Sequence, residues 1–97
     1  MATYITLTSF TDQGIRGVKD TTKRAEAVKK AAKKLGITMK DIRWTLGAYD
    51  MVVMFEAPDD ASMTALGLAI GKAGNVRTQT MRAFSAAEMD KILAKVA

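Results

Sequence analysis

The 97-residue chain is expected to form one domain over residues 1–97, and its 48% hydrophobic content is too high for a disordered protein. The absence of cysteine and histidine excludes disulfides, thiolate nucleophiles, zinc sites made of those residues and any catalytic triad that needs an imidazole. The net charge of +5 belongs to residues 19–34, where seven basic side chains accompany two acidic ones, while the rest of the chain is balanced.

The first predicted element is a strand over residues 4–8, where side chains alternate between two faces. Ile5 and Leu7 share one face, and the other face carries Tyr4, Thr6 and Thr8. Two glycines then interrupt the pattern, so residues 11–19 are expected to form a loop or a short helical turn.

A long helix is predicted to follow and to end at Gly36, a residue that suits the left-handed turn after a helix. Three side chains at its start can accept hydrogen bonds from free backbone amides: Asp20, Thr21 and Thr22. Apolar residues at helical spacing predict the face that packs on the sheet: Ala25, Val28, Ala32 and Leu35.

A β-hairpin is predicted next, with strands over residues 42–46 and 49–56 joined by a turn at Gly47-Ala48. A second helix starts after Pro58-Asp59-Asp60, closes at Gly74-Asn75 and is expected to bury Met63, Leu66, Ile70 and Ala73. A fourth strand over residues 76–84 leads into a capping box from Ser85 to Glu88. That box opens a terminal helix whose apolar side carries Met89, Ile92, Leu93 and Val96.

The order strand-helix-strand-strand-helix-strand, followed by one more helix, predicts an α+β fold of the ferredoxin-like type. Right-handed crossovers place both main helices on the same face of the sheet and leave the other face open.

The third predicted strand is apolar at odd and even positions alike over residues 51–55. Such a pattern is typical of a strand buried on both faces, whereas the open face of a lone sheet should be polar. We assign Tyr4, Thr6 and Thr8 to the open face as well, because these uncharged side chains suit a covered surface. The pattern therefore predicts a homodimer, or a higher homo-oligomer, in which two copies pack sheet to sheet.

Two aromatic rings and a carboxylate near the hairpin turn form the candidate ligand site: Trp44, Tyr49 and Asp50. The structural alternative is that Trp44 packs in the core, Asp50 bonds local amides and Tyr49 packs at the end of the sheet. Arg77 and Arg82 lie at an odd separation on the fourth strand and therefore point to opposite faces. Arg77, closer to the preceding turn, is the expected counter-charge for a flat, weakly acidic or carbonyl-bearing ligand that stacks on Trp44.

The Lys-rich segment has no aromatic residue for base stacking and only one arginine, so we interpret it as a solvated helix face without nucleic-acid binding. The internal methionines occupy core-type positions and predict no metal site, and no cofactor is expected. No apolar run approaches the roughly 20 residues that span a membrane. The N-terminus also lacks a signal-peptide pattern, so no membrane contact and a cytoplasmic location are expected.

Several segments at compatible spacing resemble the GYD domain family, and together they cover most of the chain: Gln13–Asp20, Lys23–Ala25, Trp44–Gly47, Tyr49-Asp50, Glu56–Asp60, Gly74–Thr78 and Arg82–Phe84. One residue separates the glycine from the tyrosine of the naming motif, which stands here as Gly47-Ala48-Tyr49-Asp50. The resemblance implies a small bacterial protein of the dimeric α/β-barrel group. That group includes cofactor-free monooxygenases, haem-degrading enzymes, isomerases and ligand-sensing modules.

The leading functional prediction is a non-catalytic module for small-molecule binding, assembly or regulation. The alternative is a cofactor-free enzyme, similar to a monooxygenase or an isomerase, that acts on a small aromatic or carbonyl compound with Trp44 and Tyr49 lining its site. An enzyme needs a closed cavity with converging polar groups, whereas a module needs only a groove at an interface. The sequence leaves both open.

Overall fold

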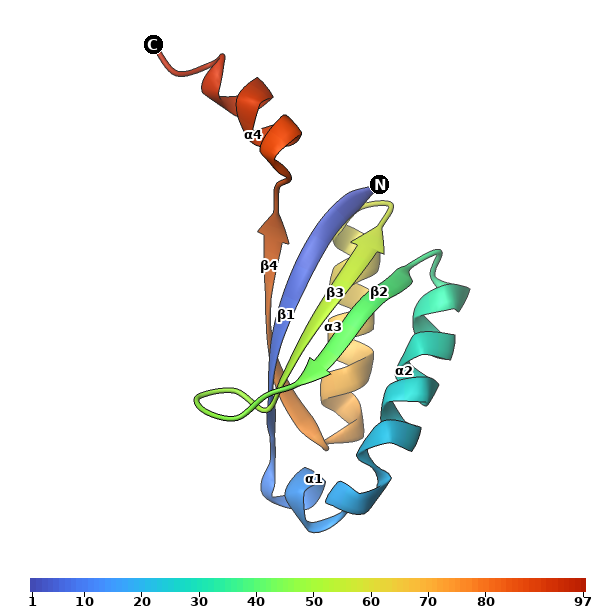
Figure 1. Cartoon of the computed structure of the whole chain (residues 1–97). Coiled ribbons are helices and arrows are strands. Elements are labelled where there is room, and N and C mark those ends of the chain that lie inside the picture. The colour runs from blue at the N-terminus through green and yellow to red at the C-terminus, as the bar shows by residue number, and fades with distance from the viewer.

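The computed structural model describes all 97 residues, with nine elements along the chain (Figure 1). They are β1 (Ala2–Phe10), α1 (Asp12–Arg16), a 3₁₀ turn η1 (Val18–Asp20), α2 (Thr21–Lys34), β2 (Thr38–Trp44), β3 (Met51–Ala57), α3 (Asp60–Ala73), β4 (Val76–Ala83) and α4 (Ala86–Leu93).

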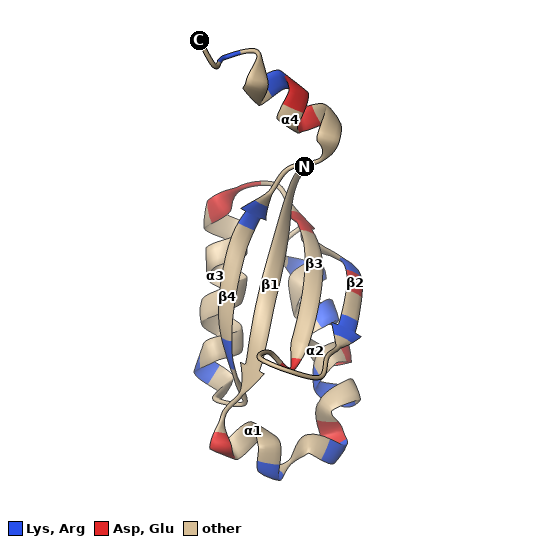
Figure 2. Ribbon diagram, turned by 60° about the vertical axis from the view of Figure 1, so that its left-hand side comes forward, with Lys and Arg blue, Asp and Glu red and all other residues tan.

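The four strands form one antiparallel sheet in the order β2-β3-β1-β4, and α2 and α3 cover the same face of it. Figure 2 views the sheet from its other face, with α2 and α3 behind the strands. This arrangement confirms the predicted ferredoxin-like α+β fold with an added C-terminal helix. We call the uncovered side the open face.

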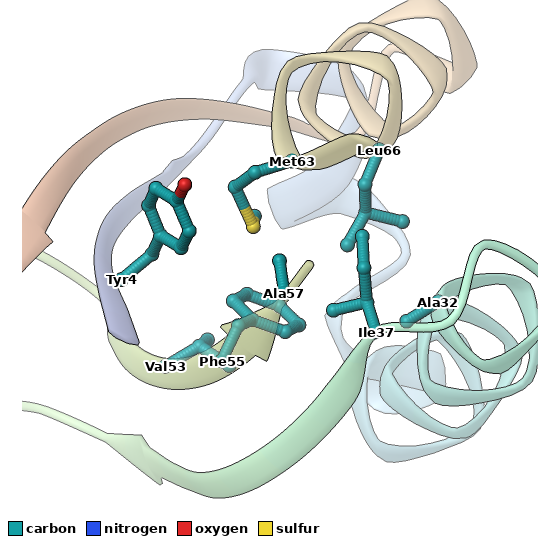
Figure 3. Packing of buried hydrophobic residues seen from close by; sticks show 8 residues of the cluster. All are labelled: Tyr4, Ala32, Ile37, Val53, Phe55, Ala57, Met63 and Leu66. Carbon is teal, nitrogen blue, oxygen red and sulfur yellow. The ribbon is translucent and has the colours of Figure 1, made fainter. Parts of the chain in front are cut away.

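The core lies between the sheet and the two helices and is small. Only 12 of the 97 residues are buried, and the largest fully enclosed side chains are those of Phe55, Ile37 and Leu66 (Figure 3). The accessible surface of 6705 Å² exceeds the value of about 5,400 Å² expected for a compact monomer of this size. The chain therefore leaves more surface uncovered than a self-sufficient globule of its length.

Strand β1 corrects the prediction about which of its faces is covered. Tyr4, Thr6 and Thr8 lie under the helices and are buried, whereas Ile5 and Leu7 lie on the open face. Polar partners make this arrangement stable: the Tyr4 hydroxyl donates to Asp60 at the start of α3, and the Thr6 hydroxyl is 3.0 Å from that of Thr80 on the neighbouring strand β4. The apolar face of β1 is thus the one that points outward.

The hairpin between β2 and β3 differs from the prediction in its limits. Strand β3 begins at Met51 instead of residue 49, and β2 ends at Trp44, so that the connection covers residues 45–50. Leu46 was expected on the same strand face as Trp44, but it lies in this connection and is fully exposed. A four-residue loop closed by a bond from the Thr45 N–H to the Asp50 carbonyl replaces the predicted two-residue turn.

The predicted helix ends are largely confirmed. The Asp59 carboxylate accepts from the Ser62 N–H at the start of α3, and this bond lowers the pKa of Asp59. Gly74 closes α3 with a left-handed φ of 84°. The capping box joins Ser85 and Glu88 through two bonds, and the bond from the Ser85 N–H lowers the pKa of Glu88.

The start of α2 differs from the prediction. Asp20 occupies its N-cap position, but no side chain there accepts from a backbone amide of the first turn. The preceding 3₁₀ turn leads directly into α2.

Short helix α1 ties the end of β1 to the turn between α3 and β4. The Thr11 N–H donates to the Asn75 carbonyl at 3.1 Å, and the Thr11 hydroxyl donates to the Gly74 carbonyl at 2.6 Å. Gln13 donates to the Ala73 carbonyl and to the Asn75 side chain. A Cβ on Gly14 would lie 1.8 Å from the Asn75 carbonyl oxygen, so only glycine permits this close approach.

Helix α4 extends away from the body of the chain, beyond the end of β4 (Figure 1). Its predicted apolar side does not join the core: Met89, Leu93 and Val96 are exposed, and Ile92 is half-buried but does not pack on the core cluster. The ion pair between Arg82 and Glu88, at 3.5 Å, connects α4 to β4. None of the helices has the length and apolar composition needed to span a membrane.

Candidate functional site

The open face of the sheet carries two apolar rows across its centre. Cross-strand pairing places Ile5 between Met54 and Met81 in one row, and Leu7 between Val52 and Gln79 in the next. Met54 and Met81 are 40% and 46% exposed, and the other apolar members of the rows are half-buried by their neighbours in the sheet. Five adjacent apolar side chains therefore face outward, and no helix or strand of the chain lies above them.

Polar and charged residues surround these rows. On β2, Arg43 and Asp41 lie opposite Val52 and Met54 and form an ion pair at 3.2 Å. The far ends of the face carry further polar side chains: Thr3, Ser9, Glu56 and Arg77. An apolar centre with a polar rim of both charges is the usual anatomy of a protein–protein interface.

The connection between β2 and β3 passes in front of the open face (Figure 2). Its Tyr49 hydroxyl donates to the Gln79 side chain at 3.2 Å, so the phenol reaches across β3 and β1 to β4. Gly47 has a φ of 131°, a conformation that an L side chain rarely adopts. The Thr45 hydroxyl donates to the Tyr49 carbonyl at 2.6 Å and closes this connection on itself.

Asp50 fixes the end of the same connection to β1. Its carboxylate accepts from the Phe10 N–H at 2.8 Å, and its own N–H donates to the Thr8 carbonyl at 2.8 Å. These bonds match the structural alternative considered for Asp50, a carboxylate that satisfies local amides.

Trp44 lies on the opposite, helix-covered side of the sheet at the end of β2. Its indole Nε1–H donates to the Thr21 hydroxyl at 3.0 Å, and 42% of the residue is exposed. The hollow beside it is an open groove between α2 and β2, lined by charged residues of α2 that include Lys23, Glu26 and Lys29. No closed cavity adjoins the indole ring.

The two arginines of β4 point to opposite faces, as their odd separation predicts. Arg77 is exposed on the open face, opposite Ser9. Arg82 lies on the helix-covered side, where its guanidinium is 5.7 Å from the ring centre of Tyr4 and 4.6 Å from that of Phe84. The hydrogen bond to Asp60, together with burial, raises the pKa of Tyr4, and the nearby Arg82 charge opposes that rise.

The structure therefore brings only part of the predicted site together. Tyr49 and Arg77 share the open face, Asp50 is bonded to the backbone at its edge, and Trp44 lies on the other side. An enzyme site that joins Trp44 and Tyr49 is not favoured by this arrangement. No three acidic side chains lie close enough to hold a metal ion.

Three residues at the centre of the open face were not among the predicted site residues, namely Ile5, Leu7 and Met81. The alternation in β1 was visible, but it does not say which face is inside. The pairing of Tyr4 with Phe55, the largest buried side chain, settles the orientation, and this register cannot be read from β1 alone.

Comparison with known proteins gives three findings. The model of the GYD domain family matches residues 4–93. A protein of Thermus thermophilus, named glutamine synthetase and cystathionine beta-lyase binding protein, is 30% identical over 90 residues, which cover 92% of this chain and 95% of that protein. A crystal structure of a protein from Thermus thermophilus has the same fold, with a TM-score of 0.57, 23% identity and coverage of 89% of this chain and 96% of that one.

Proposed function

The chain belongs to the GYD domain family, and we propose that it is a non-catalytic binding module that works as a homodimer, with the two open faces packed together across a two-fold axis. The observation that carries the proposal is the pair of apolar rows at the centre of an otherwise polar face. In one copy alone, no helix or strand covers Ile5, Leu7 and Val52, and only the Tyr49 side chain crosses this part of the face.

The dimensions of the face suit such a dimer. Four strands about 4.8 Å apart and roughly eight residues long give a footprint of roughly 500 Å², before side chains and the 45–50 connection add to it. A standard interface buries about 800 Å² per partner. Two-fold packing would place each rim of mixed charge against the same rim of the second copy, and we assign Tyr49 and Arg77 to that rim.

The named relative extends the proposal to other proteins. Its name states that it binds glutamine synthetase and cystathionine beta-lyase. We infer that this chain also binds partner proteins, with enzymes among them, and that the dimer is the form that does so. A dimer presents each partner-binding surface twice, which raises the apparent affinity for an oligomeric enzyme.

Sedimentation velocity at low micromolar concentration tests the dimer. The wild type is expected to sediment at twice the monomer mass, and Val52→Glu at the monomer mass, because a glutamate beside Leu7 would bring a charged side chain into the apolar interface, where its burial is costly. Ala65→Glu is the matched control, since Ala65 is exposed on α3, away from the open face, and the variant should remain dimeric. A folded wild-type monomer under these conditions would contradict the proposal.

Direct binding tests the partner proposal separately. Purified glutamine synthetase and cystathionine beta-lyase from the source organism of this chain would be immobilised, and binding of the wild type measured by biolayer interferometry. At least one enzyme is expected to bind the wild type and to bind Val52→Glu more weakly, with Ala65→Glu unchanged. If neither enzyme binds while the dimer is intact, the partner proposal fails and the dimer stands.

A further inference from the structure

A cavity of about 270 Å³ lies on the other side of the sheet, between its strands and helices α2 and α3. Of its 21 lining residues, 15 are hydrophobic. Phe55, Leu66 and Met39 form its wall towards the core, and Phe10, Val76 and Ala73 form the end near α1. An apolar cavity of roughly 150 Å³ already binds benzene, so this one has room for a larger ring system.

The space exists because the facing sides of the two helices carry small residues. Alanines line it from both helices: Ala25, Ala27 and Ala31 on α2, and Ala69 and Ala73 on α3. Most of these alanines are also exposed, so the cavity opens to solvent along the slot between the helices. A ligand can therefore enter without unfolding of either helix.

The end near α1 also carries incompletely paired polar groups, because Asn75 and Arg24 line the cavity and bond to Gln13 and Gly14 of that helix. Thr8 is 5% exposed and, unlike Thr6, forms no side-chain hydrogen bond. No fully enclosed side-chain nitrogen or oxygen lacks a partner, so the Thr8 hydroxyl must be open to the cavity. Asn75 lines the same end and uses only its side-chain oxygen, which accepts from Gln13.

Arg24 brings a positive charge to this end. One of its guanidinium nitrogens donates to the Gly14 carbonyl at 3.0 Å, and the side chain is half-buried. It takes part in neither of the two ion pairs of the chain, so its charge has no carboxylate partner and several N–H groups remain free. Helix α2, which forms one wall of the cavity, lies in the segment that carries the whole net charge of +5. The local field therefore favours an anion.

We propose that the cavity binds a small apolar monocarboxylate, with its carboxylate between Arg24, Thr8 and Asn75 and its flat or branched body against Phe55 and Leu66. Arginine and a hydroxyl are the donors that suit a carboxylate, and the apolar wall excludes a strongly polar body. The site lies within one chain and does not depend on the proposed dimer.

Isothermal titration calorimetry with 2-naphthoate and 2-naphthamide tests the proposal. The two compounds have the same ring system, but only the first is anionic at neutral pH. The naphthoate is expected to bind saturably and at least about tenfold more tightly than the amide, because charge-assisted bonds to Arg24 act on the anion alone. Equal binding of the two compounds, or no binding of either, would refute the proposal.

Two pairs of variants test separately whether binding depends on the Arg24 charge and on the space inside the cavity. Arg24→Gln should abolish the preference for the anion, whereas Lys23→Gln, which removes the same charge from a neighbouring α2 position outside the cavity, should preserve it. Ala69→Leu should weaken the binding of both compounds, because the larger side chain fills the slot. Ala65→Leu, one turn away and outside the slot, should leave the binding of both unchanged. Thermal unfolding of each variant shows that it is folded.

Methyl NMR of the wild type gives a test without any substitution. Titration with 2-naphthoate should shift the resonances of Val28, Leu66 and Ile70, which line or adjoin the cavity. The resonances of Ile5 and Leu7 on the open face should stay in place. Shifts confined to the open face would overturn the assignment of the site to this cavity.

Discussion

The two faces of the sheet reverse the usual distribution of polarity, and strand β1 shows this most clearly. Its covered face carries Tyr4, Thr6 and Thr8, and its uncovered face carries Ile5 and Leu7. The covered face can be polar because partners such as Asp60 and Thr80 meet it. The uncovered face has no such partners and is apolar, which is the composition expected of a surface that a second molecule covers.

The two faces should differ most in the free energy of unfolding that is lost when neighbouring side chains of β3 are truncated to alanine. Phe55→Ala is expected to lower the free energy of unfolding by about 3–5 kcal/mol, because Phe55 is 1% exposed in the core. Met54→Ala removes a side chain that is 40% exposed on the open face of the single chain. In the monomeric Val52→Glu background, its cost should stay below about 1 kcal/mol.

Urea unfolding at two protein concentrations measures both effects. In the wild-type background, Met54→Ala should shift the midpoint more at high concentration than at low, because the interface that it weakens adds to stability only where the dimer forms. Phe55→Ala should lower the midpoint by the same amount at both. Equal costs for the two truncations in the monomeric background would remove the distinction between the faces.

Helix α1 packs at one end of the covered face, and its close contact with Asn75 requires a glycine at position 14. Gly14→Ala is expected to cost about 1–3 kcal/mol, because its Cβ would meet the Asn75 carbonyl oxygen at 1.8 Å. Gly71→Ala is the matched control: no atom lies within 4 Å of the added Cβ in α3, and the variant should gain about 0.5–1 kcal/mol of helix stability. Thermal unfolding should therefore move in opposite directions for the two variants.

The fold could be predicted from the sequence because local signals agreed along the chain. The Asp59 cap, the left-handed Gly74 and the capping box at Ser85 each set an element boundary by local chemistry alone. The GYD resemblance, confirmed by the family match over residues 4–93, pointed to the same topology. The hairpin limits were less accurate, since the Asp50 bonds just before the start of β3 reach across to β1.

The candidate sites depended on contacts between distant elements and were harder to predict. Trp44 and Tyr49 are five residues apart in the chain, yet the strand end between them sends their side chains to opposite sides of the sheet. The cavity arises from alanines on two separate helices, which in the sequence are typical of ordinary helix packing. Arg24, whose guanidinium has no carboxylate partner, could not be told apart in the sequence from the lysines of the basic segment.

The covered face offers a comparison between two threonines: the Thr6 hydroxyl has a hydrogen-bond partner and the Thr8 hydroxyl has none. Thr6→Val should cost about 0.5–1.5 kcal/mol, because the Thr6–Thr80 hydrogen bond is lost. Thr8→Val should be neutral or slightly stabilising, since the Thr8 hydroxyl makes no bond within the protein and the new methyl group adds apolar contact in the cavity. The measurement is the shift of the urea midpoint of each variant from that of the wild type. A larger loss for Thr8→Val than for Thr6→Val would show that the hydroxyl has a partner in the unliganded protein.

The smallest expected effect is the contribution of Tyr4, on the covered face, to the pH dependence of folding stability. Its hydrogen bond to Asp60 and its burial raise the pKa of the phenol above the ordinary value of 10.0. The neutral phenol is thus favoured in the folded state, and its contribution to stability is fully present below about pH 10 and lost as the pH rises through the raised pKa. Tyr4→Phe should lower stability at neutral pH and remove this part of the alkaline decline. Urea midpoints measured from about pH 8 to about pH 11 test this. Parallel curves for the wild type and Tyr4→Phe would mean that the bond to Asp60 does not influence how the phenol titrates.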